Sequence, residues 1–288
     1  MRALVTGYKG YIGGNLTKEL NNRDIPWIGI DLKDGDASDD LCNGVPSWAS
    51  AFEPDIVFHL AAIPRVAYSV KNPLHVMRNN VVSTSAVLDF ARKKNIPVVY
   101  SSSSSVVGNG DGPASPYALS KYVGELEALL YYELYGLKTV ALRYFNVYSY
   151  DQVADSEYAT VVCNWKRYIS NPGLIPFITG TGEQRRDMTH VDDIVSANIF
   201  CAESINKDDL WGNWYDVGSG DNISLNELKD IVLQYFPNQE FEYVAERVGD
   251  VMYTEADLDK FKAHGWESEV PLREGLNNIY KKLKEDLS

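Results

Sequence analysis

The stretch Thr6-Gly7-Tyr8-Lys9-Gly10-Tyr11-Ile12-Gly13 decides the fold, because it places three spaced glycines directly after the short apolar segment Ala3-Leu4-Val5. Glycines at this spacing let the backbone turn tightly, approach a pyrophosphate and pack a following helix against the strand. The N–H groups that begin such a helix then face the anion. The pattern predicts a strand, a phosphate-binding loop and a helix, which together are typical of a dinucleotide site.

The residues after this loop favour a dinucleotide site over an ordinary glycine-rich turn. Apolar residues follow at helical spacing, and a second apolar segment, Trp27-Ile28-Gly29-Ile30, ends in Asp31. An acid at this place in a Rossmann unit accepts hydrogen bonds from the adenosine ribose hydroxyls, and its carboxylate repels a 2′-phosphate. We therefore predict NAD rather than NADP as the cofactor. The alternative is that Asp31 is a polar residue that merely ends a strand.

Length, charge and cysteine content exclude several classes of protein. A chain of 288 residues suits one large α/β domain or a dinucleotide domain with a smaller partner. The formal net charge of -13 argues against a nucleic-acid partner, which usually needs a basic face. Three cysteines without Cys-x-x-Cys spacing indicate neither a disulfide framework nor a metal site. The first strand leaves no room for a signal peptide, and no apolar run approaches the roughly 18 residues that span a bilayer. We expect a cytoplasmic protein without a membrane partner.

Apolar segments alternate with helical patterns through the first half of the chain, which predicts a doubly wound parallel sheet. After residue 147 this alternation ends, and the predicted fold is an α/β Rossmann doubly wound parallel sheet with a smaller C-terminal substrate-binding region. Residues 1–147 form the NAD-binding domain, with returns to it near 187–217, and residues 148–288 form mainly the second region. The expected strands are 2–6, 25–30, 55–60, 97–102, 138–145 and 214–217; the expected helices are 11–22, 73–94, 116–135, 191–205, 224–235, 255–264 and 272–286.

A tyrosine and a lysine stand four residues apart in Tyr117-Ala118-Leu119-Ser120-Lys121, so both lie on one face of an expected helix. A lysine charge this close can lower the pKa of a phenol from about 10 toward neutrality and let it act as a base. Tyr280 and Lys284 repeat the spacing, and we expect them on a solvated face of the terminal helix. Tyr117 differs because it follows the strand whose carboxyl end carries Ser101 to Ser105, and parallel sheets bind ligands beyond that end.

Together these motifs resemble the extended short-chain dehydrogenase/reductases of the NAD-dependent epimerase/dehydratase family, most closely the 4-epimerases of UDP-glucose and UDP-N-acetylglucosamine. The resemblance covers essentially the whole chain. It rests on residues 6–13, 59–62, 80–84, 101–108, 117–121, 143–148, 182–187 with 191–193, and 247–250.

The resemblance implies three catalytic residues. Ser103 takes the place of the family's serine because it lies five residues before Gly108, Tyr117 is the acid and base, and Lys121 holds the nicotinamide ribose. Ser104 and Ser105 are then bystanders, although the residues alone leave them nearly as eligible. The implied NAD contacts are Gly7, Gly10, Tyr11, Ile12, Gly13, Asp31, Asp40, Leu41, Leu60, Ala61, Ala62, Asn80, Ser101, Tyr117, Lys121 and Tyr144. The implied substrate contacts are Ser103, Tyr117, Asn146, Arg186, Arg247, Asp250 and Thr254.

The implied reaction interconverts UDP-glucose and UDP-galactose, or their N-acetylhexosamine forms, through a transient 4-keto intermediate on tightly bound NAD. Ser104 and Ser105 stand where the family's dehydratases and decarboxylases have an acid, which disfavours elimination. The alternatives are an NAD(P)-dependent reductase of a 4-keto nucleotide sugar and a non-catalytic protein that senses the dinucleotide. Thr254 has two interpretations of equal weight, as a small side chain beside the sugar C2 or as a helix N-cap.

Some features depart from the family pattern or concern assembly. The connection from Ser103 to Tyr117 is short, and Arg65 adds an unexpected charge near the sugar site. Val107 and Ser149 stand where the family usually has tyrosine and glycine. The resemblance implies a homodimer through helices near 73–94 and 116–135, where an apolar stripe would serve the interface or partly the chain's own sheet. The stripe is formed by Leu126, Leu129, Leu130 and Leu134.

Overall fold

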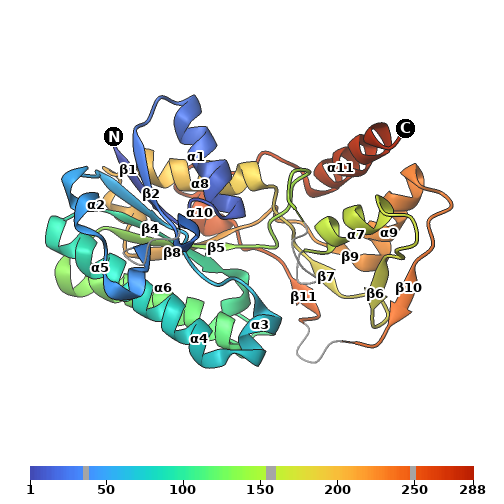
Figure 1. The fold of residues 1–288 in the computed structure, drawn as a ribbon, viewed down its shortest axis with the longest axis horizontal. Helices are drawn as coiled ribbons and strands as arrows, with labels where there is room; N and C mark the ends of the chain where they lie inside the picture. Colours follow the sequence, from blue (N-terminus) through green and yellow to red (C-terminus); the bar gives the residue numbers. More distant parts are fainter. Residues whose placement is uncertain (35–38, 154–159, 247–250) are drawn as a thin grey trace.

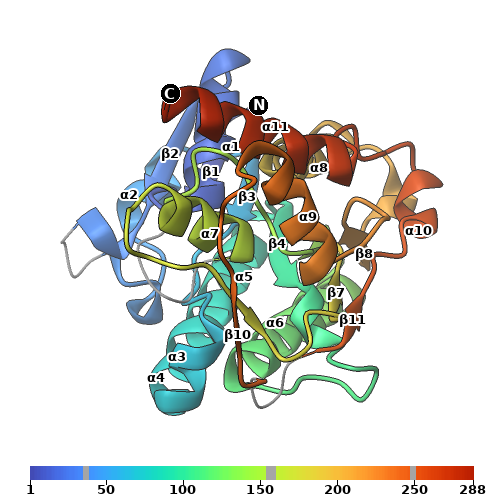
Figure 2. The same ribbon diagram turned by 90° about the vertical axis from the view of Figure 1, so that its right-hand side faces the viewer.

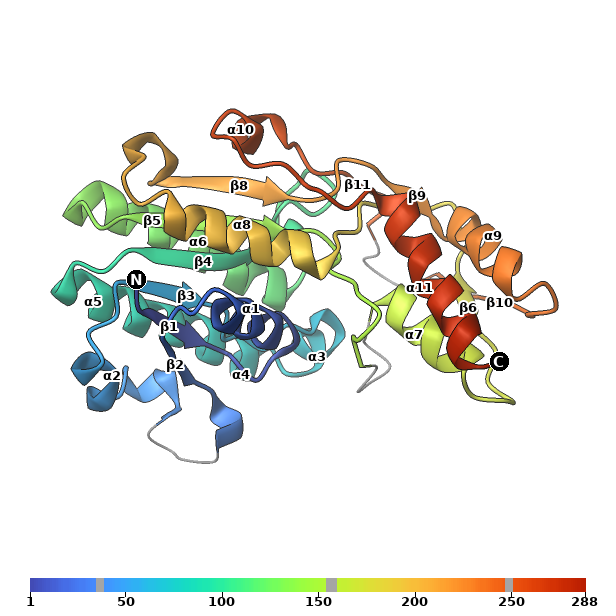
Figure 3. The same cartoon turned by 90° about the horizontal axis from the view of Figure 1, so that it is seen from above.

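The computed structural model describes residues 1–34, 39–153, 160–246 and 251–288. Two unequal parts make up the molecule: a larger part built on a parallel sheet and a smaller part that carries the C-terminus (Figure 1). Figure 2 shows the smaller part facing the viewer, with the terminal helix crossing in front of the larger part. In Figure 3 the strands of the sheet point toward the smaller part, so their carboxyl ends lie at the junction.

A six-stranded sheet in the order β2-β1-β3-β4-β5-β8 forms the larger part, and each of its pairings is parallel. β1, β3 and β5 are buried along their whole length, as expected for strands that are covered on both faces. The predicted doubly wound parallel sheet is confirmed, and the strand bounds differ from prediction by one or two residues. These bounds are β1 (Ala3–Thr6), β2 (Trp27–Ile30), β3 (Ile56–His59), β4 (Val98–Ser103), β5 (Thr139–Tyr144) and β8 (Asn213–Val217).

Helices cover both faces of the sheet. α1 (Tyr11–Asn22) and α8 (Val191–Glu203) pack together on one face, whereas α5 (Ser83–Lys94) and α6 (Pro116–Tyr135) lie on the other (Figure 1). Ser115 begins α6, because its Oγ accepts the N–H of Ala118 at 3.1 Å. The bounds of α6 agree with prediction. Tyr117 lies in the first turn of this helix, so the position of the helix start determines where its side chain lies.

The strand order reverses between β1 and β3. The chain leaves β1 toward β2 on one side and returns to β3 on the other side of β1. Parallel sheets bind ligands in the crevice beyond the carboxyl ends of the strands at such a point. The glycine loop follows β1 and residues 60–62 follow β3, so both segments border this crevice.

Two expected helices differ in the structure. The helix expected over 73–94 is divided into α4 (Pro73–Met77), a π-helical turn (Arg78–Val82) and α5. Of the helix expected over 255–264, only α10 (Asp259–Lys262) is helical in the structure. Thr254 lies before it in β11 (Tyr253–Thr254), which pairs with β7 (Arg185–Arg186). The N-cap interpretation of Thr254 is therefore wrong.

The smaller part has a hydrophobic core of its own and two short sheets. β6 pairs with β10, and β7 lies between β11 and β9. Its helices are α7 (Val161–Ile169), α9 (Leu225–Tyr235) and α11 (Leu272–Asp286), and its remaining strands are β6 (Phe177–Thr179), β9 (Ile223–Ser224) and β10 (Glu242–Val244). Two short helices of the larger part, α2 (Ser47–Ala51) and α3 (Val66–Lys71), complete the description. The domain division near residue 147 stays a prediction.

Tyr280 corrects one expectation about the terminal helix. We expected it on a solvated face, but its side chain is fully buried in the core of the smaller part. The reason is that α11 packs along α9, which turns this side of the helix inward. Lys284, one turn later, is exposed. The two residues of the second tyrosine–lysine pair therefore differ in exposure, one in the core and the other at the surface.

No helix in the described ranges has the length and hydropathy to cross a bilayer. Nor do these ranges contain a group of three or more His, Cys, Asp or Glu side chains arranged to hold a metal ion.

Candidate active site

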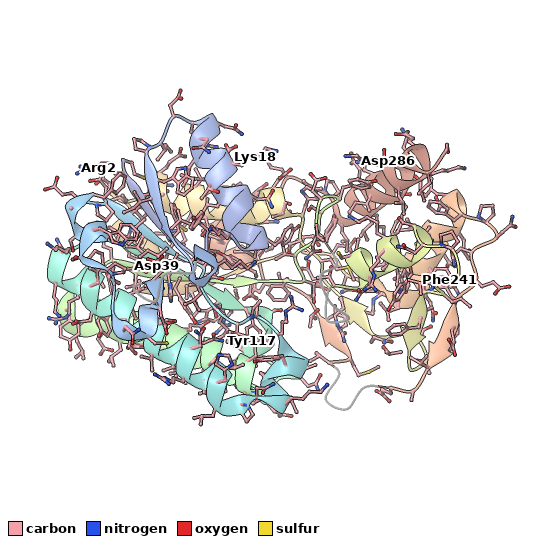
Figure 4. The ribbon with its side chains drawn as sticks, in the orientation of Figure 1. Arg2, Lys18, Asp39, Tyr117, Phe241 and Asp286 are labelled. Atoms are coloured by element: carbon pink, nitrogen blue, oxygen red, sulfur yellow. The ribbon has the colours of Figure 1, made fainter. Side chains whose placement is uncertain are left out.

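A cleft of about 720 Å³ runs along the carboxyl ends of the strands. Its walls come from the segments that follow β1, β2, β3, β4 and β5 and from the start of α6. Figure 4 shows Tyr117 near the junction with the smaller part and Asp39 farther into the larger part. Most residues predicted to contact NAD line this cleft, namely Gly7, Gly10, Tyr11, Ile12, Gly13, Asp31, Asp40, Leu41, Leu60, Ala61, Ala62, Ser101, Tyr117, Lys121 and Tyr144.

The glycine loop leaves no room for side chains at two of its glycines. Gly7 has a φ of 75°, and a Cβ there would lie 2.7 Å from the backbone nitrogen of Ala61. A Cβ on Gly13 would lie 2.2 Å from the carbonyl oxygen of Gly7. The loop thus packs backbone against backbone, and the first N–H groups of α1 stand beside the cleft without partners inside the helix. This cradle fits the pyrophosphate of a dinucleotide.

We expect Gly13→Ala to lower NAD affinity by about 10- to 100-fold, because its methyl group must push the Gly7 carbonyl out of place. Gly14→Ala is the matched control on the same helix. A Cβ at Gly14 meets nothing closer than 3.8 Å, so its NAD affinity should stay that of the wild type. Calorimetric titration of cofactor-stripped protein measures both affinities. Equal affinity of the two variants would contradict this account of the loop.

Asp31 joins the glycine loop to the end of β2. Its Oδ2 accepts the N–H of Lys9 and its Oδ1 accepts the N–H of Lys33, each at 3.0 Å. Both bonds hold the carboxylate at the wall of the cleft, where it fits the adenosine ribose of NAD. Asp40, also predicted for the cofactor, lines the cleft and caps the next turn by accepting the N–H of Cys42 at 2.9 Å.

The three residues predicted to be catalytic meet in the cleft. Ser103 ends β4, and its side chain forms a hydrogen bond with the side chain of Tyr117. The backbone N–H of Tyr117 donates to Ser69 Oγ at 3.1 Å, which ties the start of α6 to α3. Lys121 lies one turn later, is 3% exposed and donates from Nζ to the carbonyl oxygen of Ser101 at 2.7 Å.

Burial shifts the pKa values of Lys121 and Tyr117 in opposite directions. It lowers the pKa of Lys121 to about 7 and raises the pKa of Tyr117 above its ordinary value. The hydrogen bond with Ser103 acts the other way and lowers the pKa of Tyr117. From the sequence we expected Lys121 to lower this pKa. In the structure the surroundings disfavour the charge of both groups, and Ser103 is the neighbour that favours the phenolate.

A buried charge network holds the end of β4, next to Ser103. Arg143 donates from Nε and Nη2 to the carboxylate of Glu125, at 2.9 and 2.5 Å, and Ser102 Oγ donates to the same carboxylate at 2.7 Å. The guanidinium of Arg143 also lies 3.5 Å from the centre of the Trp214 ring. We did not predict this role for Glu125. The available signal was its spacing of one helical turn after Lys121.

Asp216, at the edge of this network, should make stability depend on pH. Burial raises the pKa of its carboxyl to about 6, and Oδ1 has no hydrogen-bond partner among the described residues. The groups that face it are Arg143, which favours its charge, and Asp257 and Glu125, which disfavour it.

Between about pH 4 and 6 folded Asp216 keeps a proton that the unfolded chain has lost, so the unfolding free energy falls as pH rises. Asp216→Asn removes this dependence. We expect the variant to gain about 2 to 3 kcal/mol relative to the wild type between about pH 4 and pH 7. Urea unfolding at the two pH values measures the gain, and a difference that stays constant with pH would contradict the shifted pKa.

The predicted substrate residues are only partly gathered. Asn146 lines the cleft with a φ of 30°, and its Nδ2 donates to the carbonyl oxygen of Asp187 at 2.6 Å. Arg186 and Thr254 are not among the residues that line the cleft; they pair with each other in the neighbouring small sheet. The predicted substrate residues Arg247 and Asp250 lie outside the described residues.

Asn80 was predicted to contact the cofactor, but it is not among the residues that line the cleft. Its buried side chain accepts the N–H of Ile63 at 2.8 Å and donates to Ser120 Oγ at 2.9 Å. These bonds hold the segment after β3 against α6. Asn80 therefore supports two walls of the cleft from behind.

Of the residues that depart from the family pattern, Arg65 lines the cleft and Ser149 contacts a residue that lines it. The carbonyl oxygen of Arg65 accepts the N–H of Ser69, whose side chain holds Tyr117. Arg65 is therefore one helical turn from the residue that fixes Tyr117. Ser149 accepts a hydrogen bond from the Tyr11 hydroxyl at 2.7 Å and so links the glycine loop to the segment that leads into the smaller part.

A doubly wound sheet with this glycine loop, a partly buried serine and a buried tyrosine and lysine defines a dinucleotide-dependent enzyme. The chain matches the model of the NAD dependent epimerase/dehydratase family over residues 3–218, and it belongs to that family. The resemblance seen in the sequence is thereby confirmed, and NAD is the cofactor.

Relatives in this family differ in substrate. The chain is similar to the UDP-N-acetylglucosamine 4-epimerase of Methanobrevibacter ruminantium M1, solved with UDP-N-acetylmuramic acid, with 30% identity, a TM-score of 0.87 and coverage of 99% and 98% of the two chains. MoeE5, solved with UDP-glucose and NAD, has 30% identity, a TM-score of 0.86 and full coverage of both chains; it was also solved with UDP-glucuronic acid. An ADP-L-glycero-D-manno-heptose-6-epimerase of Brachyspira hyodysenteriae is 28% identical, with 92% of each chain covered.

Proposed function

We propose that this nucleotide-sugar epimerase acts at C4 of a UDP-sugar and interconverts UDP-glucose with UDP-galactose, their N-acetylhexosamine forms, or both. The observation that carries the proposal is the meeting of Ser103, Tyr117 and Lys121 at the end of the cleft that borders Asn146. The similarity to a UDP-N-acetylglucosamine 4-epimerase and to MoeE5 with UDP-glucose supports it.

The chain's own residues account for the proton transfers. Tyr117 Oη takes the proton of the sugar 4-hydroxyl and later returns it to the same oxygen. Ser103 donates a hydrogen bond to that oxygen while it loses its proton. Lys121 holds the nicotinamide ribose. Bound NAD would supply the acceptor for the C4 hydride and then its donor to the other face of the 4-keto sugar, so no external oxidant or reductant is needed.

The carboxylates of the cleft argue against elimination. Those that line it among the described residues are Asp31, Asp39 and Asp40, all in the segment that follows β2. Beside Tyr117 the wall is formed instead by Ser104 and Ser105. Removal of a C5 proton needs a base at that place, and a serine hydroxyl is a poor one.

Arg65 favours a second candidate substrate, a UDP-sugar with a carboxylate. It lines the cleft one helical turn before Ser69, which holds the backbone of Tyr117. A guanidinium binds a carboxylate through two parallel hydrogen bonds. Two similar structures hold sugars of this kind, UDP-N-acetylmuramic acid and UDP-glucuronic acid. The same Ser103, Tyr117 and Lys121 would epimerise it.

The test is to incubate the purified protein, without added cofactor, with UDP-glucose, UDP-N-acetylglucosamine and UDP-glucuronic acid in separate tubes, and to follow the anomeric protons by NMR. We expect the galacto epimer to appear in at least one tube, and the fastest tube names the preferred sugar. Turnover that requires added NAD(P)+ and stops when it has been converted to NAD(P)H would establish the reductase alternative, running in reverse, instead. No change in any tube, with or without added NAD, would overturn the 4-epimerase proposal for these sugars.

We also propose a homodimer built on α6. Leu126, Leu130 and Leu134 recur along one face of this helix and are 47%, 47% and 60% exposed. An exposed apolar stripe of this length marks an interaction surface. We expect light scattering after size exclusion to give twice the chain mass of 32.3 kDa, and Leu130→Glu to give one chain mass. A monomeric wild type would contradict the proposal.

A further inference from the structure

Five consecutive serines, Ser101 to Ser105, run from the end of β4 into the turn Ser104–Val106, and three of them have separate tasks. The carbonyl oxygen of Ser101 holds Lys121, and Ser102 Oγ donates to buried Glu125. Ser103 bonds with Tyr117. The sequence left Ser105 as a bystander, yet it lines the cleft and contacts Ser103 twice.

The two contacts determine where the Ser103 hydroxyl can point. Ser103 Oγ accepts the backbone N–H of Ser105 at 3.3 Å, and Ser105 Oγ donates to it at 2.9 Å. A hydroxyl oxygen accepts two hydrogen bonds and donates one. With both accepting positions filled by Ser105, the remaining hydrogen of Ser103 is directed to its other neighbour, the phenol oxygen of Tyr117.

We infer that Ser105 is a positioning residue that holds the Ser103 hydroxyl in the donating orientation toward Tyr117. The inference rests on the proposed function for the role of Tyr117 as the base. The chain Ser105, Ser103, Tyr117 is a cooperative series in which each donor strengthens the next bond. Since Ser103 is the neighbour that favours the phenolate, Ser105 acts on the base through it.

Ser105→Ala keeps the backbone N–H but removes the donating hydroxyl, so the Ser103 hydrogen is no longer directed to Tyr117. Ser105→Thr retains a hydroxyl and is the conservative rescue. Ser104→Ala removes a hydroxyl from the same turn, and it is the matched comparison because the described bonds to Ser103 come from Ser105.

Tyrosine labelled with ¹³C at Cζ reports the pKa of Tyr117 directly in the NAD-bound protein, and the spectrum of Tyr117→Phe identifies its signal. We expect Tyr117 to titrate about half to one pH unit higher in Ser105→Ala than in the wild type. Ser105→Thr should restore the wild-type titration, and Ser104→Ala should leave it in place. Identical titration in the wild type and Ser105→Ala would overturn the inference.

Kinetics with the sugar that the wild type converts separates positioning from direct substrate binding. Loss of the Ser105 hydroxyl should lower kcat by about 3- to 10-fold, move the acid limb of the pH profile upward and leave KM unchanged. A higher KM with an unmoved pH profile would assign Ser105 to the substrate and overturn the inference. If the wild type converts no sugar, the proposed function fails, while the NMR titration still decides the role of Ser105.

Discussion

Tyr117→Phe should lower kcat for epimerisation by about 10²- to 10⁴-fold, the usual contribution of a positioned acid–base group. In the proposed reaction the phenol oxygen removes and returns the proton of the sugar 4-hydroxyl, and phenylalanine keeps the ring but not the oxygen. NAD affinity should stay close to that of the wild type, since the glycine loop and Asp31, which we predict to hold the other end of the cofactor, are unchanged. Single-turnover kinetics and calorimetry measure the two effects separately.

Tyr122→Phe is the control for this variant, because Tyr122 follows Lys121 on the same helix but is not among the residues that line the cleft. Its kcat should stay within about 2-fold of the wild type. If Tyr117→Phe retained wild-type turnover, another group would be the base, and the similarity to 4-epimerases would then extend to fold and cofactor without the proposed chemistry.

The sheet and its main helices could be predicted because each has a strong local signal. β1 and β5 are mostly apolar, and Ser115 with Pro116 marks the start of α6 in the sequence itself. Short strands have no such signal. β7 has two residues, and its partners lie near residues 223 and 253, so only the folded chain defines it. The error on Thr254 has this origin.

In the candidate site, too, residues in local motifs could be predicted, whereas residues whose place depends on tertiary packing could not. Glycine spacing and the tyrosine–lysine pair identified residues that do line the cleft, because those motifs are fixed by local geometry. Asn80 and Tyr280 were misplaced, since burial depends on which helix packs against which, and the sequence does not state this. The direction of the Tyr117 pKa was also missed, because it depends on the burial of both Tyr117 and Lys121.

Glu125→Gln is the variant with the largest expected effect on stability. Glu125 is 1% exposed, and its carboxylate is the hydrogen-bonding partner of buried Arg143 and of Ser102. Removing one partner of a buried ion pair costs about 3 to 5 kcal/mol, because the other charge stays buried. We expect the lower end of this range, because Asp216 lies 4.0 Å from Arg143 and still faces its charge. Urea unfolding at neutral pH measures the loss.

A double-mutant cycle decides whether Glu125→Gln lowers the unfolding free energy because Arg143 is left buried without its partner. Arg143→Met removes that charge while keeping a long side chain over Trp214, so Glu125→Gln should cost much less in this background than in the wild type. Glu133→Gln, at an exposed position of the same helix, should change the unfolding free energy by less than about 0.5 kcal/mol. Equal costs in both backgrounds would show that Glu125 acts through packing.

Turnover should fall together with stability in Glu125→Gln, because Ser102 shares the strand end that presents Ser103 to Tyr117.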